Sequence, residues 1–269
     1  LASPKRIWRT PGDGSVTTHS SDDILRCFTT RPRKEYARLL PIAHLSGVHR
    51  RAIDRIRQTP VGRVCPPVSP DYTFAFLQLA VVDEVCIINS PLVVYVSKQH
   101  SNGRNMQLKL APGKQFTKEL GGHNEIYFDH VPVKAFTIPG IIYNDYEKLR
   151  KLVGGRLERH SIDPVSYFLE CHGAIRYAEE EGVPMTEELA EWRRAFEEQP
   201  EELKAEIMKQ LSADRATLRR AIRKVGKRLG IKYLENKCKS FFRSQIQHNP
   251  EWRFESAMDY IEWADKECP

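Results

Sequence analysis

The chain has 269 residues, of which 41% are hydrophobic and 29% charged, and its formal net charge is +7 at pH 7. This length allows one large domain or two smaller ones, and the composition is typical of a soluble globular protein. No apolar run approaches the roughly 18 residues of a membrane-spanning helix, so we expect no such span. The moderate positive charge is compatible with anionic partners but selects none of them.

Six cysteines are spread along the sequence without a Cys-x-x-Cys pair or the Cys/His spacing of a zinc site. Cys86 falls in a strand-like apolar stretch and Cys171 in a helical one. Buried, reduced thiols are the simplest explanation, because free cysteine is among the most buried residue types. We therefore expect a cytoplasmic protein without structural zinc.

The first expected helix follows a stretch rich in Pro, Gly, Ser and Thr. Ser20-Ser21-Asp22-Asp23 precedes the apolar Ile24-Leu25, which predicts a capped helix start. The adjacent aspartates could instead bind a metal ion. The helix start is favoured, because acidic side chains stabilise the positive end of a helix.

A second helix is predicted from Val48 to Ile56, where Val48, Ala52, Ile53 and Ile56 share one face and arginines occupy most of the other. Thr59-Pro60 ends it, because the residue before proline avoids helical geometry.

The next helix is introduced by a stiff, proline-rich loop from Pro66 to Pro70. Either Ser69 or Asp71 is expected to cap this helix, with Pro70 in its first turn. Tyr72 to Val82 is nearly all apolar. This composition predicts a helix that is buried on all sides.

Two short strands are expected next, Val85 to Asn89 and Leu92 to Ser97, separated by Ser90-Pro91. His100 to Asn105 is predicted to be a polar turn. Residues 106–140 are expected to be irregular, with extended stretches at Tyr127-Phe128 and from Val131 to Ile138.

The character of the sequence changes near Tyr143, after which helical patterns dominate. The expected helices are 145–153, 164–181, 186–198, 200–211, 214–229, 233–247 and 254–266, with Thr186 as the cap of the third. The sequence therefore predicts an α/β domain over residues 1–142 and an all-helical domain over residues 143–269.

Two stretches of the first domain carry a family pattern. One runs from Ala43-His44-Leu45-Ser46-Gly47-Val48-His49-Arg50-Arg51 to Asp54. The other runs from Ser69-Pro70-Asp71-Tyr72 through the apolar helix and strands to His100-Ser101-Asn102-Gly103. Over residues 36 to 104 the chain resembles the acceptor-side half of a family 2 glycosyltransferase of the GT-A type. The resemblance implies the C-terminal portion of a GT-A-like α/β domain, with the donor-side half expected upstream of Leu1.

The resemblance also implies a reaction, the transfer of a sugar from a nucleotide-sugar donor to an acceptor hydroxyl, with inversion. In inverting members a carboxylate on a loop that enters a helix accepts the proton of the attacking hydroxyl. Asp71 matches that place, and a helix N-terminus keeps a carboxylate ionised. The alternative is that Asp71 only caps its helix.

Further site residues follow from the same resemblance. The substrate-binding candidates are His44, Arg50, Arg51, Ser69, Tyr72 and Ser101, and the two arginines could also be an ordinary solvated helix face. The donor diphosphate would need a divalent ion, Mn²⁺ or Mg²⁺, held mainly by residues upstream of Leu1. His100 is a candidate ligand for this ion, since neutral imidazole suits manganese-type ions, and the alternative is a solvated turn.

A rival function comes from the basic amphipathic helix expected at 214–229. Residues 213–232 contain eight basic side chains and one acidic one. The charges could simply be solvated while the apolar stripe packs inside the protein, or the helix could bind an anionic membrane surface. The alternative to an enzyme is thus a non-enzymatic basic binding module for anionic lipid, nucleic acid or a protein, with nucleic acid the less favoured partner. An inactive glycosyltransferase-like scaffold is a third option.

Overall fold

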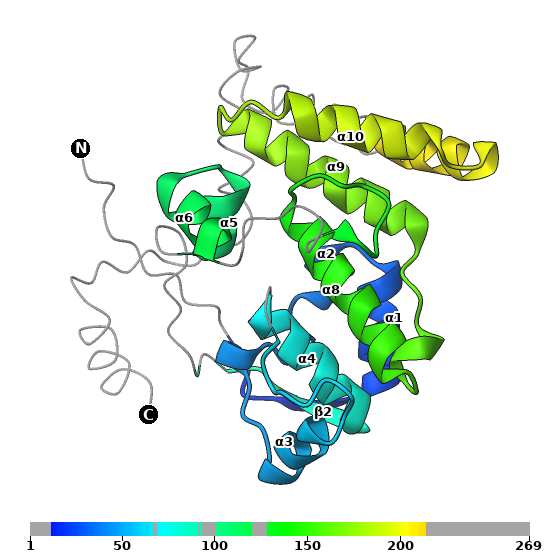
Figure 1. The fold of residues 1–269 in the computed structure, drawn as a ribbon. Coiled ribbons are helices and arrows are strands. Elements are labelled where there is room, and N and C mark those ends of the chain that lie inside the picture. Colours follow the sequence, from blue (N-terminus) through cyan, green and yellow to red (C-terminus); the bar gives the residue numbers. More distant parts are fainter. Residues whose placement is uncertain (1–11, 67–68, 91, 93–100, 120–127, 214–269) are drawn as a thin grey trace, which may run out of the picture. The chain divides into compact units, whose positions relative to one another are not determined.

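The computed structural model describes residues 12–66, 69–90, 92, 101–119 and 128–213 (Figure 1). Contacts divide the chain into two compact units, one of Leu1–Thr17, Ile88–Tyr95 and Ser212–Pro269, and one of Thr18–Ile87 and Val96–Leu211. The helices named below lie in the second unit. Within the described ranges, no helix combines the length and the apolar character needed to cross a bilayer.

The sheet consists of two strands, β1 (Val16–Ser20) and β2 (Glu84–Ile88). The Gly14 amide donates to the Asn89 carbonyl and the Ser21 amide donates to the Asp83 carbonyl, so the strands are antiparallel. The predicted strand from Val85 is confirmed, whereas β1 was not predicted. The second predicted strand, from Leu92, lies outside the described residues except for Leu92 itself. The described part of the chain is therefore mostly helical, with one small sheet.

The first helix confirms the predicted start. In α1 (Ser21–Thr30) the Ser20 side chain accepts a hydrogen bond from the Asp23 amide at 3.0 Å. Ile24, Leu25 and Phe28 on its inner face are fully buried. A short helix, α2 (Arg33–Tyr36), follows.

The buried helix predicted after the proline-rich loop is α4 (Pro70–Val81), and all side chains from Thr73 to Leu79 are buried. The 3-10 turn η1 (Ala43–Leu45) and α3 (Arg50–Arg57) both pack against it. The one buried amide of this helix, Gln78, donates to the Pro41 carbonyl at 2.7 Å, which satisfies it inside the core.

The polar turn predicted at 100–105 and the irregular stretch after it are wrong over the described residues. Two helices occur there instead, α5 (Asn102–Gln107) and α6 (Ala111–Glu119). Gly113, expected to mark a loop, is where α6 meets α5: a Cβ there would lie 2.4 Å from the backbone of Asn105 and Met106. A residue without a side chain thus permits the close contact.

The central helix is α8 (Ile138–Val153), which begins earlier than predicted because Thr137 caps the Gly140 amide at 3.1 Å. It packs against both α4 and α9 (Pro164–Glu180). The predicted domain boundary at residues 142/143 falls inside α8. The residues on either side of it belong to one hydrophobic core, in which Phe28 and Phe76 contact Tyr146 at ring distances of 5.0 Å. Val131 to Thr137, expected to be extended, contains no strand.

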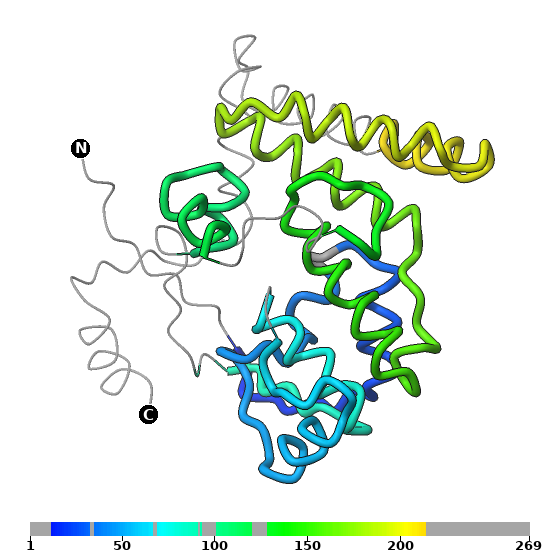
Figure 2. The backbone as a smooth tube through the Cα atoms, viewed as in Figure 1, coloured from blue at the N-terminus to red at the C-terminus, as the bar shows by residue number. Residues whose placement is uncertain are grey.

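The helical second half is confirmed as far as residue 213. After α9 the chain turns back at Gly182, which adopts a φ of +86°, into α10 (Thr186–Glu197), as Figure 2 shows. Residues 201–213 are also helical. Thr186 was the wrong cap, because Met185 occupies the N-cap position and makes no side-chain bond. The three later predicted helices lie outside the described residues.

The described cysteines are all free thiols. Cys171 is fully buried, 3.6 Å from the Thr137 hydroxyl, and burial raises the pKa of its thiol to about 12. Cys27 is half-buried. Cys65 is exposed. Cys86, expected to be buried, is also exposed, because one side of the two-stranded sheet faces solvent.

A network of charged groups ties the C-terminal end of α4 to the loop around η2 (Leu157–Arg159). Arg156 donates to the carbonyls of Leu79 and Val82, and it pairs with Asp22 at 3.2 Å and with Asp83. Asp22 also contacts His160 at 2.8 Å and Arg159 at 3.0 Å. Cations and a histidine therefore surround Asp22, as expected of a structural carboxylate.

Candidate functional site

Asp71 lies in the first turn of α4 with a half-buried side chain. Within the described ranges its carboxylate makes no hydrogen bond or ion pair. The N-cap residue, Ser69, makes no side-chain capping bond either. The helix thus starts without a side-chain cap, and Pro70 in its first turn has no N–H that would need a partner. In this geometry Asp71 does not act as a cap, and its oxygens are available to another group.

The loop before Asp71 is anchored to α8 by one buried carboxylate. Asp145 is 4% exposed, and its Oδ2 accepts from the Ser69 amide at 2.9 Å and from the Ser69 hydroxyl. Hydrogen bonds to an ionised acceptor are stronger than neutral ones. Ser69, expected to touch substrate, therefore has a positioning role in the structure.

A second anchor comes from α4 itself. The buried Thr73 hydroxyl lies 3.2 Å from the Pro66 carbonyl and 3.3 Å from the Pro70 carbonyl. The loop is thus held at both ends. Because Asp71 directly follows this loop, its backbone position is fixed by the core, and it lies in the first turn, at the positive end of the helix dipole.

Tyr72 continues the same turn. Its ring is half-buried, with its centroid 6.5 Å from that of Phe76. It supplies an apolar surface beside Asp71, of the kind that binds the face of a sugar or another apolar group.

His44, Arg50 and Arg51 lie on the elements that pack against α4, and their side chains are exposed. Arg50 is 85% exposed, and its nearest acid is Asp54, at 4.0 Å. In the described part of the chain, none of these three side chains bonds to Asp71. The structure places them around the same helix, and their contact with a substrate stays a prediction.

Ser101 has a structural role that the sequence did not indicate. Its side chain caps α5 by accepting from the Arg104 amide at 3.3 Å, and α5 packs against α6 and α8. His100, the proposed metal ligand, lies outside the described residues.

Sequence reasoning missed Asp145 and Thr73. A signal for Asp145 exists in the sequence, because this acidic residue lies within the mostly apolar and aromatic stretch Ile141-Ile142-Tyr143-Asn144-Asp145-Tyr146. A buried carboxylate requires strong hydrogen bonds. The identity of its partner, 76 positions away in the sequence, could not be predicted.

The site as described does not fit a metal ion by itself. Among the described residues, no three His, Cys, Asp or Glu side chains are grouped closely enough to share one. Asp71 is a single carboxylate without a second ligand. The divalent ion implied by the resemblance was expected mainly from residues upstream of Leu1 and stays a prediction.

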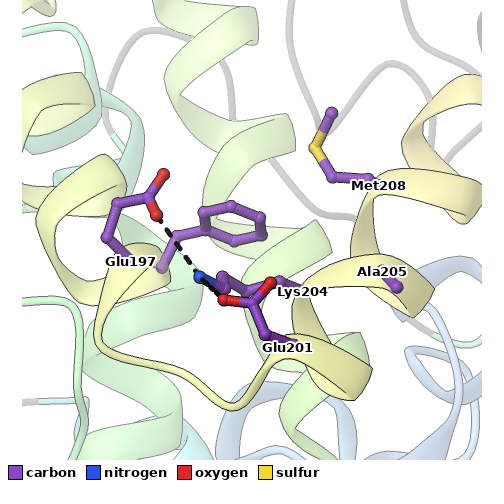
Figure 3. A pocket seen from close by; sticks show the side chains of 6 residues that line it. Glu197, Glu201, Lys204, Ala205 and Met208 are labelled. Atoms are coloured by element: carbon purple, nitrogen blue, oxygen red, sulfur yellow. Dashed lines mark hydrogen bonds and ion pairs between the residues drawn. The ribbon is translucent and has the colours of Figure 1, made fainter.

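A surface hollow of about 320 Å³ lies away from these residues, between the end of α10 and the helical residues 201–213 (Figure 3). Its lining residues are Phe196, Glu197, Glu201, Lys204, Ala205 and Met208. Lys204 pairs with Glu201 at 2.5 Å and with Glu197 at 3.5 Å. Because its one cation is already paired with two carboxylates, the lining offers no unpaired positive charge to a ligand.

No protein-family model, no curated protein and no solved structure matches the chain. A function for the chain therefore has to be inferred from the resemblance of residues 36 to 104 and from the geometry around Asp71.

Proposed function

We propose that the chain is the acceptor-side part of an inverting, family 2-like glycosyltransferase and that Asp71 is its general base. The supporting observation is a half-buried carboxylate that has no partner among the described residues, at the start of a buried helix and after a loop anchored at both ends. We also propose that the α/β part has a GT-A-like fold and that the protein is cytoplasmic, with peripheral contact to a membrane.

The proposed reaction is a displacement at the anomeric carbon of a nucleotide sugar. The acceptor oxygen forms a bond to this carbon while its proton passes to an Asp71 oxygen. The bond from the carbon to the diphosphate breaks, and the nucleoside diphosphate leaves with the electron pair. A positioned general base contributes about 10²–10⁴-fold to such a rate. A bound Mn²⁺ or Mg²⁺ would offset the charge of the diphosphate.

The anchors support this role for Asp71. A base must be held near its proton with little freedom, and a displacement of about 1 Å can cost about a hundredfold in rate. The Ser69 hydroxyl is bonded to Asp145, and the Thr73 hydroxyl lies against loop carbonyls. Asp71 is therefore the free proton acceptor of this turn. His44, Arg50, Arg51, Tyr72 and Ser101 complete the proposed substrate side.

The test measures nucleoside diphosphate release by the protein encoded by its complete reading frame. UDP-, GDP- and dTDP-linked sugars are supplied with Mn²⁺ or Mg²⁺ and a mixture of saccharide acceptors. We expect Asp71→Asn to lower the acceptor-dependent rate about 10²–10⁴-fold without changing the thermal unfolding temperature. Glu187→Gln is the matched control, because Glu187 is also an exposed first-turn acid.

Either of two results would refute the proposal. One is that the unaltered protein releases no nucleoside diphosphate from any of these donors. The other is that Asp71→Asn and Glu187→Gln release it equally fast. The rival function, a basic binding module at 214–229, lies outside the described residues, and no observation of the structure favours it.

A further inference from the structure

The exposed face of α3 carries a dense group of arginines. Successive residues of a helix are rotated by about 100°, which places Arg57, Arg50, Asp54, Arg51 and Arg55 on one continuous arc. Ala52 and Ile56 on the opposite side are buried in the core. All four arginines of this eight-residue helix are exposed.

This positive charge is poorly neutralised within the protein. Asp54 is the single acid of the helix, and it lies 4.0 Å from both Arg50 and Arg57, at the limit of an ion pair. The Arg51 guanidinium has no bonded partner in the described ranges. Arg55 donates to the Val81 carbonyl, which satisfies a donor but leaves its charge unpaired.

The charge is also local. From residue 128 to residue 213, acidic side chains outnumber basic ones. The arginine face, by contrast, carries four cations and one anion. A surface of this kind attracts a polyanionic partner by its local field, even where the rest of the described molecule does not.

Two observations favour a lipid surface over nucleic acid. No Phe, Tyr or Trp occurs between Tyr36 and Tyr72, so α3 and the segments on either side of it carry none of the aromatic side chains on which single-strand binders stack bases. Leu45 in η1 is 49% exposed. It begins only four residues before His49, the cap of α3, and so lies within about 14 Å of the helix start. An exposed leucine this near in the chain to an arginine-rich helix matches the boundary between headgroups and acyl chains.

We propose that the arginine face of α3, with Leu45 at its edge, is a docking surface for anionic lipid membranes. Its apolar stripe stays in the protein core, so α3 does not insert but lies against the headgroups as a rigid charged face. This inference does not require the proposed transferase activity, although Arg50 and Arg51 also belong to its proposed substrate side, and it names a surface other than the basic segment at 214–229.

The test is co-sedimentation of the full chain with vesicles of phosphatidylcholine alone or with added phosphatidylserine, at about 0.1 M and about 0.5 M salt. We expect binding only to the anionic vesicles and weaker binding at high salt. The triple variant Arg50→Gln, Arg51→Gln, Arg57→Gln should lower the partition coefficient about a hundredfold. Leu45→Ser should lower it further.

The matched control neutralises three other exposed cations that have no bonded partner in the described ranges, through Lys114→Gln, Lys118→Gln and Arg193→Gln. Both triples are also measured in a background of Arg219→Gln, Arg220→Gln and Arg223→Gln, which reduces the contribution of the second basic segment. The proposal is overturned if the α3 triple weakens binding no more than the control triple in both backgrounds. It is equally overturned if anionic vesicles do not bind, or if duplex or single-stranded DNA binds more tightly than the vesicles do.

Discussion

Asp145 shows how one buried side chain can define a site to which it does not belong. Its carboxylate is almost fully enclosed on α8, yet it accepts both hydrogen-bond donors of Ser69, just before the half-buried Asp71. A buried charge is tolerated only where such bonds compensate for its lost hydration. The position of the candidate base is therefore set by a residue of another helix.

We expect Asp145→Asn to destabilise the protein by about 1–3 kcal/mol, since a neutral amide replaces an ionised acceptor and brings N–H donors into a site that supplies donors. Urea unfolding measures this difference. Asp129 is an exposed aspartate, and Asp129→Asn is therefore the control, which should change the free energy of unfolding by less than about 0.5 kcal/mol. Equal stabilities of the two variants would contradict the anchoring role of Asp145.

At the scale of elements, helices with local start signals were predictable from the sequence. Ser20 before α1 and Pro70 in α4 predict the helix starts to within a few residues, and the structure confirms both. β1 was missed because its pairing partner, β2, is more than sixty residues away. α5 was missed because the polar residues from His100 to Asn105 were taken as a turn, and α6 because residues 106–140 were taken as irregular.

The same contrast holds for the candidate site. The Pro-Asp step before an apolar helix was sufficient to place Asp71 in the first turn of α4. The anchors of its loop were not predictable, because Asp145 reaches it only through the packing of α8 on α4. Local chemistry could be inferred from the sequence, while long-range hydrogen bonds required the fold.

Glycine substitutions test the α5–α6 contact. Gly113→Ala should destabilise the protein by about 1–3 kcal/mol, because its Cβ would overlap backbone atoms that cannot move independently. Gly173→Ala is the control: Gly173 is an exposed α9 residue with open space around it, and alanine there should stabilise by about 0.5–1 kcal/mol. Thermal unfolding measures the stability of both variants. A Gly113→Ala protein as stable as Gly173→Ala would contradict the close contact between α5 and α6.

At the scale of the whole described unit, Asp22 joins parts of the chain that are far apart in sequence. The His160 hydrogen bond, with the charges of Arg159 and Arg156, lowers the pKa of the Asp22 carboxyl below its ordinary value of 3.8. A carboxyl whose pKa is lower in the folded state contributes stability above its unfolded pKa, and this contribution disappears as the pH falls through the folded value.

The unfolding free energy of Asp22→Asn should therefore be lower than that of the unaltered protein at about pH 7, and the difference should shrink as the pH falls below the ordinary carboxyl pKa of 3.8. Because Asp22 is 42% exposed, the difference at neutral pH is expected to be only about 1 kcal/mol. Denaturant unfolding at several pH values measures it. A difference that stays constant across this range would show that the Asp22 charge does not contribute to stability.

The enclosed thiol of Cys171 can report how often the surrounding part of the core opens. It lies between the start of α8 and the middle of α9, so a thiol reagent reaches it only when these helices separate. In a variant with the other five cysteines replaced by serine, the slow labelling of this one sulfur would report how often that part of the core opens. Under native conditions, the labelling rate at increasing urea would then distinguish local separation of α8 and α9 from unfolding of the whole unit.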